Sequence, residues 1–136
     1  MKNEINQTWI FSQSPEEVWE YLTKPELLEQ WLGKTDFRPV PGHIFQFASP
    51  NGNHAHCEVL EVKPVTYLSY TWQKKSNGDK KSYRSTVAWT LVPKENGTEL
   101  QLVHGGFVSI EDLTGHEKGW KDCVQKIVKL INAIKA

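Results

Sequence analysis

The stretch Thr114–Ala136, TGHEKGWKDCVQKIVKLINAIKA, has the strongest periodicity in this sequence. Its apolar residues recur at intervals of three and four, the spacing of one face of an α-helix. Thr114 followed by Glu117 resembles a capping box, so we expect the helix to begin near Thr114. An isolated helix gains little stability in water, so its apolar stripe needs a broad partner surface. The stripe consists of Trp120, Cys123, Val124, Ile127, Ile131 and Ile134.

The partner surface is predicted upstream, where apolar and polar residues alternate with the period of two that is typical of half-buried strands. Short turns rich in proline, glycine and asparagine separate most of these segments, which favours an antiparallel meander. Polar segments at 50–52 and 75–81 are two of the expected turns. The expected strands cover residues 4–12, a segment around Phe45 and Phe47, and residues 55–62, 67–74, 83–92 and 99–104.

Two short helices are expected between the first two strands. Ser14-Pro15-Glu16-Glu17 places a serine at the N-cap, a proline at the first helical position and a glutamate at the third, and this helix runs to about Leu22. A second start signal follows with Thr23 as its cap, and that helix stops at Gly33. Two helices are favoured over one because Pro25 would clash with the turn before it.

The expected fold is therefore α+β. A curved antiparallel sheet of about six strands is wrapped on the long C-terminal helix, and two short helices follow the first strand. The length of 136 residues predicts a single domain, residues 1–136.

Composition excludes several classes of function. The 16 basic and 16 acidic side chains cancel and are interspersed, so we expect neither nucleic acid nor an anionic membrane as a partner. No apolar run is long enough for a transmembrane helix, and the polar segment Met1–Gln7 gives no sign of a signal peptide. Cys57 and Cys123 lie far apart without metal-ligand spacing, which predicts reduced, buried thiols in a cytoplasmic protein.

Several segments, taken in order, resemble a known family, the activator of heat-shock-protein-90 ATPase homologues in the START-like (SRPBCC) helix-grip superfamily. Any one segment is weak, but their order and spacing along nearly the whole chain are specific. They are SPEEVW (14–19), TKPELLEQW (23–31), PGHIFQF (41–47), EVKP (61–64), LSYTW (68–72), STVAWTL (85–91), GTELQLVHGGF (97–107) and GW (119–120).

The resemblance implies an elongated cavity between sheet and helix, which relatives in the superfamily use for lipids, polyketides or other hydrophobic ligands. Two positions depart from the family pattern. Lys24 stands where an acidic residue usually precedes the proline of the second helix. Leu32 replaces one of two tryptophans at the end of that helix, a change that could alter the mouth of the cavity.

Residues that alternate toward the space between sheet and helix are the candidate ligand-binding residues. Aromatic rings dominate this set, and an apolar pocket with a few polar groups is the usual form of a small-molecule site. The alternative is that these rings simply fill a core. The candidates are Trp31, Phe45, Phe47, Tyr70, Trp72, Trp89, His104, Phe107, Trp120, Cys123 and Ile127.

Histidines are the other candidates for chemistry. His104 alternates inward, where it could orient the polar end of a ligand, together with Tyr70 or His116, or act as an acid or base. The alternative is a hydrogen-bonded core histidine. His54 and His56 share one strand face, but no third ligand is apparent, so we predict no metal site.

The sequence therefore predicts binding of a small hydrophobic or amphipathic ligand. No catalytic motif is recognisable, so we assign no catalytic residue and expect neither enzymatic activity nor a cofactor. Two alternatives stay open. One is an enzyme, cyclase-like or hydrolase-like, that acts on an aromatic or polyketide-type substrate with His104 as its acid–base. The other is a chaperone-associated protein-interaction module of the stress response, which the family name suggests. The eukaryotic activator that gives the family its name carries a further domain, so the name transfers weakly.

Overall fold

The computed structural model describes residues 4–48, 54–74, 84–107 and 109–134. Within these ranges the chain forms seven strands and three helices. In chain order they are β1 (Glu4–Phe11), α1 (Pro15–Thr23), α2 (Pro25–Trp31), β2 (Lys34–Thr35), β3 (Ile44–Ala48), β4 (His54–Lys63), β5 (Tyr67–Lys74), β6 (Ser85–Lys94), β7 (Gly97–Gly105) and α3 (Ile110–Ile134).

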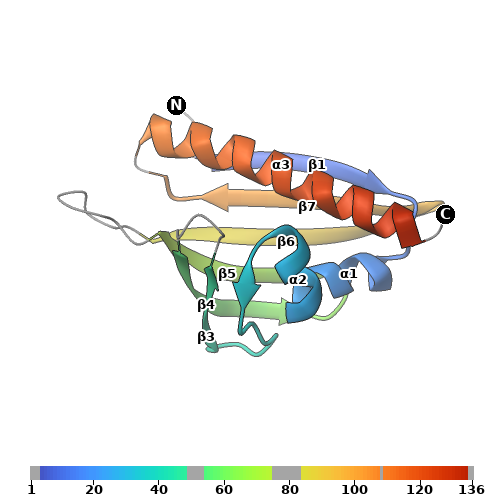
Figure 1. Ribbon diagram of the computed structural model, residues 1–136, viewed down its shortest axis with the longest axis horizontal. Coiled ribbons are helices and arrows are strands. Elements are labelled where there is room, and N and C mark those ends of the chain that lie inside the picture. The colour runs from blue at the N-terminus through green and yellow to red at the C-terminus, as the bar shows by residue number, and fades with distance from the viewer. Residues whose placement is uncertain (1–3, 49–53, 75–83, 108, 135–136) are drawn as a thin grey trace.

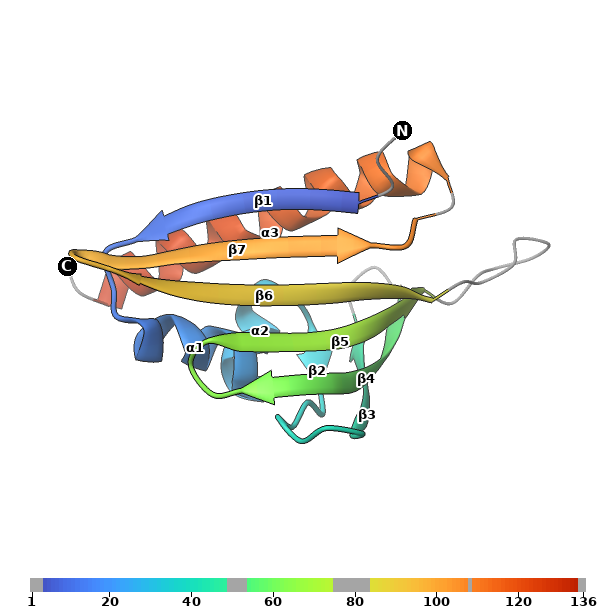
Figure 2. The same cartoon turned by 180° about the vertical axis from the view of Figure 1, so that it is seen from behind.

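The strands form one antiparallel sheet in the order β1-β7-β6-β5-β4-β3-β2. All three helices lie on one face of this curled sheet, in front of the strands in Figure 1 and behind them in Figure 2. The long helix α3 lies over β1 and β7 (Figure 1). Helices α1 and α2 follow β1 in the chain and lie over β5 and β6, toward the end of the sheet where β5 begins and β6 ends (Figure 1). The α+β helix-grip fold expected from the sequence is confirmed.

The sheet has seven strands in the described residues rather than about six. The additional strand is β2, whose two residues pair with β3 in the register Lys34↔Ala48 and Thr35↔Phe47. Two residues are too few to show a period of two. The preceding Gly33 fits only without a side chain, because a Cβ there would lie 2.7 Å from the carbonyl oxygen of Ala48.

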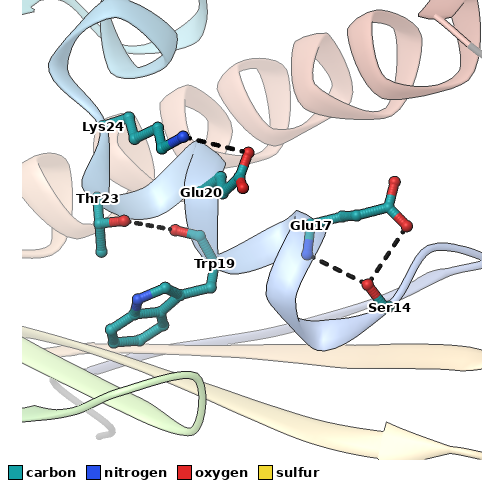
Figure 3. A network of polar contacts seen from close by, with 6 residues as sticks. All are labelled: Ser14, Glu17, Trp19, Glu20, Thr23 and Lys24. Carbon is teal, nitrogen blue, oxygen red and sulfur yellow. Dashed lines mark hydrogen bonds and ion pairs between the residues drawn. The ribbon is translucent and has the colours of Figure 1, made fainter.

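The start of α1 is as predicted. The Ser14 hydroxyl accepts a hydrogen bond from the Glu17 backbone N–H and donates one to the Glu17 carboxylate, and both distances are 3.3 Å (Figure 3). The predicted cap of α2 is wrong. The Thr23 hydroxyl instead donates to the Trp19 carbonyl at 2.9 Å (Figure 3). Lys24 occupies the N-cap position of α2, but its side chain makes no capping hydrogen bond and pairs with Glu20 at 3.6 Å instead (Figure 3).

The start of α3 also differs from the prediction. The helix begins at Ile110 rather than at Thr114, so the expected capping box of Thr114 with Glu117 is wrong. The Ser109 hydroxyl accepts from the Asp112 N–H at 3.0 Å instead. The extra turn brings Leu113 against the core, and this apolar contact favours the earlier start.

The core lies between the concave face of the sheet and the helices. The central and C-terminal parts of α3 bury Trp120, Val124, Ile127 and Ile131 there, as predicted. The side chain of Ile134 and the expected turns at 50–52 and 75–81 lie outside the described residues. In the described ranges, no helix is long and apolar enough to span a membrane.

Candidate functional site

A cavity of about 420 Å³ lies between the first half of α3 and strands β3, β4 and β5. Small-molecule sites in proteins span about 300–1,000 Å³, so this volume suits a small ligand. The cavity is lined by Leu32, Phe47, His54, Ala55, Trp72, Glu111, Asp112, Gly115, His116, Gly119, Trp120 and Cys123.

Helix α3 supplies more than half of these residues, all on one face. Two of them, Gly115 and Gly119, are one helical turn apart, and a Cβ added at either would meet no atom within 4 Å. A glycine inside a helix costs roughly 0.5–1 kcal/mol relative to alanine. Since no neighbouring atom requires a glycine at either position, their effect in the fold is to leave the cavity wider beside the helix.

Three aromatic rings from different elements form an aromatic wall of the cavity. Trp72 of β5 lies between Phe47 of β3 and Trp120 of α3, with ring centroids 5.7 Å and 5.1 Å away. Rings in such tilted contacts stabilise one another beyond the area they bury. The wall is therefore built on secondary structure rather than on loops.

A buried chain of hydrogen bonds fixes this wall from behind. The Trp120 indole N–H donates to Nδ1 of His104 at 2.8 Å. Because Nδ1 accepts, the neutral ring carries its proton on Nε2 and donates it to the Ser85 hydroxyl, also at 2.8 Å. The Ser85 hydroxyl then donates to the Trp72 carbonyl at 2.8 Å. The chain joins α3 to β7, β6 and β5.

His104 is held neutral by this setting. Its side chain is fully buried, and burial, followed by the nearby His116, lowers the pKa of His104 from 6.5 to about 3. Both ring nitrogens are already bonded within the protein. His104 is thus the hydrogen-bonded core histidine that the sequence left as an alternative, and its ring does not line the cavity.

Polar groups gather where α3 begins. Glu111 and Asp112 occupy the first turn of the helix, and His116 and His54 line the same cavity from α3 and β4. Nδ1–H of His116 donates to the carbonyl of Asp112 at 2.8 Å, which fixes the tautomer of this imidazole. No lysine or arginine is among the lining residues in the described part of the chain.

The sequence-predicted site residues divide into two groups. Phe47, Trp72, Trp120 and Cys123 line the cavity. The other seven are buried in the packed core, where for example the Trp89 indole donates to the Tyr70 hydroxyl at 2.9 Å. These seven are Trp31, Phe45, Tyr70, Trp89, His104, Phe107 and Ile127. Whether the first group binds a ligand stays a prediction.

Sequence reasoning missed several lining residues. Ala55, Glu111, Asp112, Gly115 and Gly119 were not among the candidates, and Leu32 was expected only as a residue that could alter the mouth of the cavity. One signal was available, since two glycines four residues apart weaken a helix that is otherwise uninterrupted. Glu111 and Asp112 gave no such signal, because they precede Thr114, where the helix was expected to begin.

A metal site finds no support in the described part of the chain. There, no group of three or more histidine, cysteine, aspartate or glutamate side chains is placed to hold a metal ion. His54 and His56 are both exposed on β4.

The family model described as "Activator of Hsp90 ATPase homolog 1-like protein" matches residues 12–132. The chain belongs to this family. The resemblance seen in the sequence is thereby confirmed. No curated protein matches the chain.

Several solved structures have the same fold. The protein MLL2253 from Mesorhizobium loti is 35% identical, with a TM-score of 0.90 over 96% of this chain and 97% of that one. The AHSA1 protein from Silicibacter pomeroyi is 20% identical, with a TM-score of 0.79 over 98% and 99% of the two chains. DynU16, a putative protein in the dynemicin biosynthetic locus, is 21% identical, with a TM-score of 0.87 over 97% of this chain and 48% of its own.

Proposed function

We propose that this protein binds a small hydrophobic or amphipathic ligand in the cavity between α3 and strands β3–β5. The observation that carries the proposal is a cavity of about 420 Å³ beside Gly115 and Gly119. Both glycines are exposed, so the space is open to solvent beside α3, and larger side chains there would narrow it without a clash. Two helical glycines that leave it open favour a function for the space.

Binding would be driven by burial of apolar ligand surface, worth about 25 cal/mol per Å². Phe47, Trp72 and Trp120 would contact the apolar part of the ligand, and Glu111, Asp112 and His116 would contact its polar end. The same fold in DynU16, a putative protein in the dynemicin biosynthetic locus, is compatible with a role in small-molecule chemistry.

The first test is native mass spectrometry of the purified protein, before and after denaturation. We expect an additional mass that disappears when the protein unfolds. If the native mass equals that of the bare chain, binding of the neutral fluorophore N-phenyl-1-naphthylamine decides. No enhancement of its fluorescence by the folded protein would contradict the proposal.

A matched pair of variants tests whether the fluorophore binds in the cavity. Gly119→Leu puts a large side chain at a position where a Cβ meets nothing within 4 Å, so we expect a folded protein with a filled cavity and loss of the fluorophore. Gln125→Leu adds the same side chain at an exposed position of α3 outside the cavity and should leave binding unchanged. Equal binding by both variants would mean that the probe occupies another site.

The position of His104 argues against its role as the acid–base of the enzyme alternative. With its pKa lowered to about 3 and both ring nitrogens bonded, His104 neither reaches the cavity nor exchanges protons near neutral pH. The protein-interaction alternative rests on the family name alone. A native mass without addition, together with no probe binding, would favour it.

A further inference from the structure

We propose that the ligand is an organic cation, an amine or ammonium group on an apolar or aromatic body. This inference rests on the proposed function and names the chemical class that the cavity would take. Two independent features of its wall point to the same charge: the aromatic rings and the acidic rim.

The aromatic wall is the first feature. Phe47, Trp72 and Trp120 converge on the cavity from three different elements, with neighbouring centroids 5.7 Å and 5.1 Å apart. The faces of aromatic rings carry negative partial charge and attract cations, and clusters of such rings are a known means of binding alkylammonium groups. The Trp120 N–H is bonded to His104, so this indole offers the ligand its ring but not its donor.

The acidic rim is the second feature. Glu111 and Asp112 line the cavity where α3 begins, whereas the described lining contains neither lysine nor arginine. Carboxylates accept hydrogen bonds and do not donate them, so they match a protonated amine and repel a carboxylate, sulfate or phosphate. His54 and His116 line the same part of the cavity, so all probes are compared at one fixed pH.

The test uses three dansyl probes that differ only in the end of a short alkyl tether. After the same pentamethylene tether, dansylcadaverine ends in an ammonium group, N-hexyl dansylamide in a methyl group and dansyl-6-aminohexanoate in a carboxylate. At pH 8 and low salt we expect the ammonium probe to bind about three- to tenfold more tightly than the neutral probe, and the carboxylate probe to bind most weakly. Added salt should narrow these differences because it screens exposed charges.

The variant Glu111→Gln/Asp112→Asn should reduce the preference for the ammonium probe, measured as the ratio of its affinity to that of the neutral probe. Glu117→Gln is a control for the loss of a carboxylate on the same helix, since Glu117 lies outside the cavity lining. Circular dichroism and thermal melting would show that each variant is folded.

The outcomes separate the two proposals. If the neutral probe does not bind, the proposed function fails. If the neutral probe binds but the carboxylate probe binds as tightly as the ammonium probe, the cavity binds ligands without the proposed charge preference, and the inference is overturned. It is also overturned if Glu117→Gln abolishes the preference as completely as the double variant does.

Discussion

Acidification should destabilise this protein through His104 in a defined pH window. The ring is fully buried, and its pKa is lowered from 6.5 to about 3, mainly by burial. Above pH 6.5 the ring is neutral in both the folded and the unfolded chain, so its contribution to stability is fully present. Between pH 6.5 and about 3 the unfolded chain binds a proton that the folded chain does not, and stability falls as the pH falls.

The size of the effect follows from the two pKa values. Each pH unit inside the window lowers the free energy of unfolding by about 1.4 kcal/mol. Between pH 7 and pH 5 the loss from His104 alone is therefore about 2 kcal/mol. A protonated Nδ1 would also face the Trp120 N–H, a donor against a donor, across a contact that is 2.8 Å in the neutral form.

The assay is urea denaturation at several pH values between 5 and 7, for the natural protein and for His104→Asn. Asparagine cannot titrate, and its side-chain oxygen can still accept a bond from an indole N–H. We expect the variant to be less stable at pH 7, but the difference between the two proteins should shrink by about 2 kcal/mol at pH 5. An NMR titration of the folded protein should find the His104 ring neutral at pH 5.

Two results would refute this reasoning. One is an equal slope of stability against pH in the natural protein and the variant. The other is a His104 ring that titrates near pH 6.5 in the folded protein. Either would mean that the hydrogen-bond chain behind the cavity wall does not hold His104 neutral, and the acid–base alternative would return.

Three further predictions concern glycine positions and a helix cap. Gly115→Ala and Gly119→Ala should each raise the free energy of unfolding by roughly 0.5–1 kcal/mol, measured by urea denaturation, because neither methyl group meets a neighbour; a loss of stability would show that the space beside α3 is filled. Gly97→Ala should lower stability by more than about 2 kcal/mol in the same assay, because its φ of +149° is left-handed and its Cβ would collide with a carbonyl of β1; a neutral effect would contradict the turn geometry. Ser14→Ala should lower the free energy of unfolding by about 1 kcal/mol through loss of the N-cap of α1, and Ser14→Thr should retain most of it; equal effects of both substitutions would speak against capping.

Local sequence signals predicted helix starts and strands correctly where only one such signal was present. Ser14-Pro15 with Glu17 defined the start of α1 because the cap, the proline and the glutamate act within one turn of chain. The long strands were equally clear, since their inward residues alternate over eight to ten positions. The two-residue β2 carries no period and exists only because β3 is there to pair with it.

Where two local signals competed, contacts distant in sequence decided. Ser109 with Asp112 and Thr114 with Glu117 both have the spacing of a helix start, and α3 begins with the first pair because the additional turn places Leu113 against the core. Thr23 was equally ambiguous, and its hydroxyl bonds back to Trp19 within α1 rather than capping α2.

The sequence by itself determined the family, the helix-grip fold and the inward faces of the strands and of α3, because these follow from periodicity and order along the chain. Only the tertiary structure decided which inward residues are packed and which border a cavity. Alternation places a side chain on one face of a strand. Whether that side chain packs against a neighbour depends on which residue of the opposite element lies across from it. His104 is hydrogen-bonded to Trp120 and Ser85 and is part of the packed core. Trp72 instead lines the cavity together with Gly115 and Gly119.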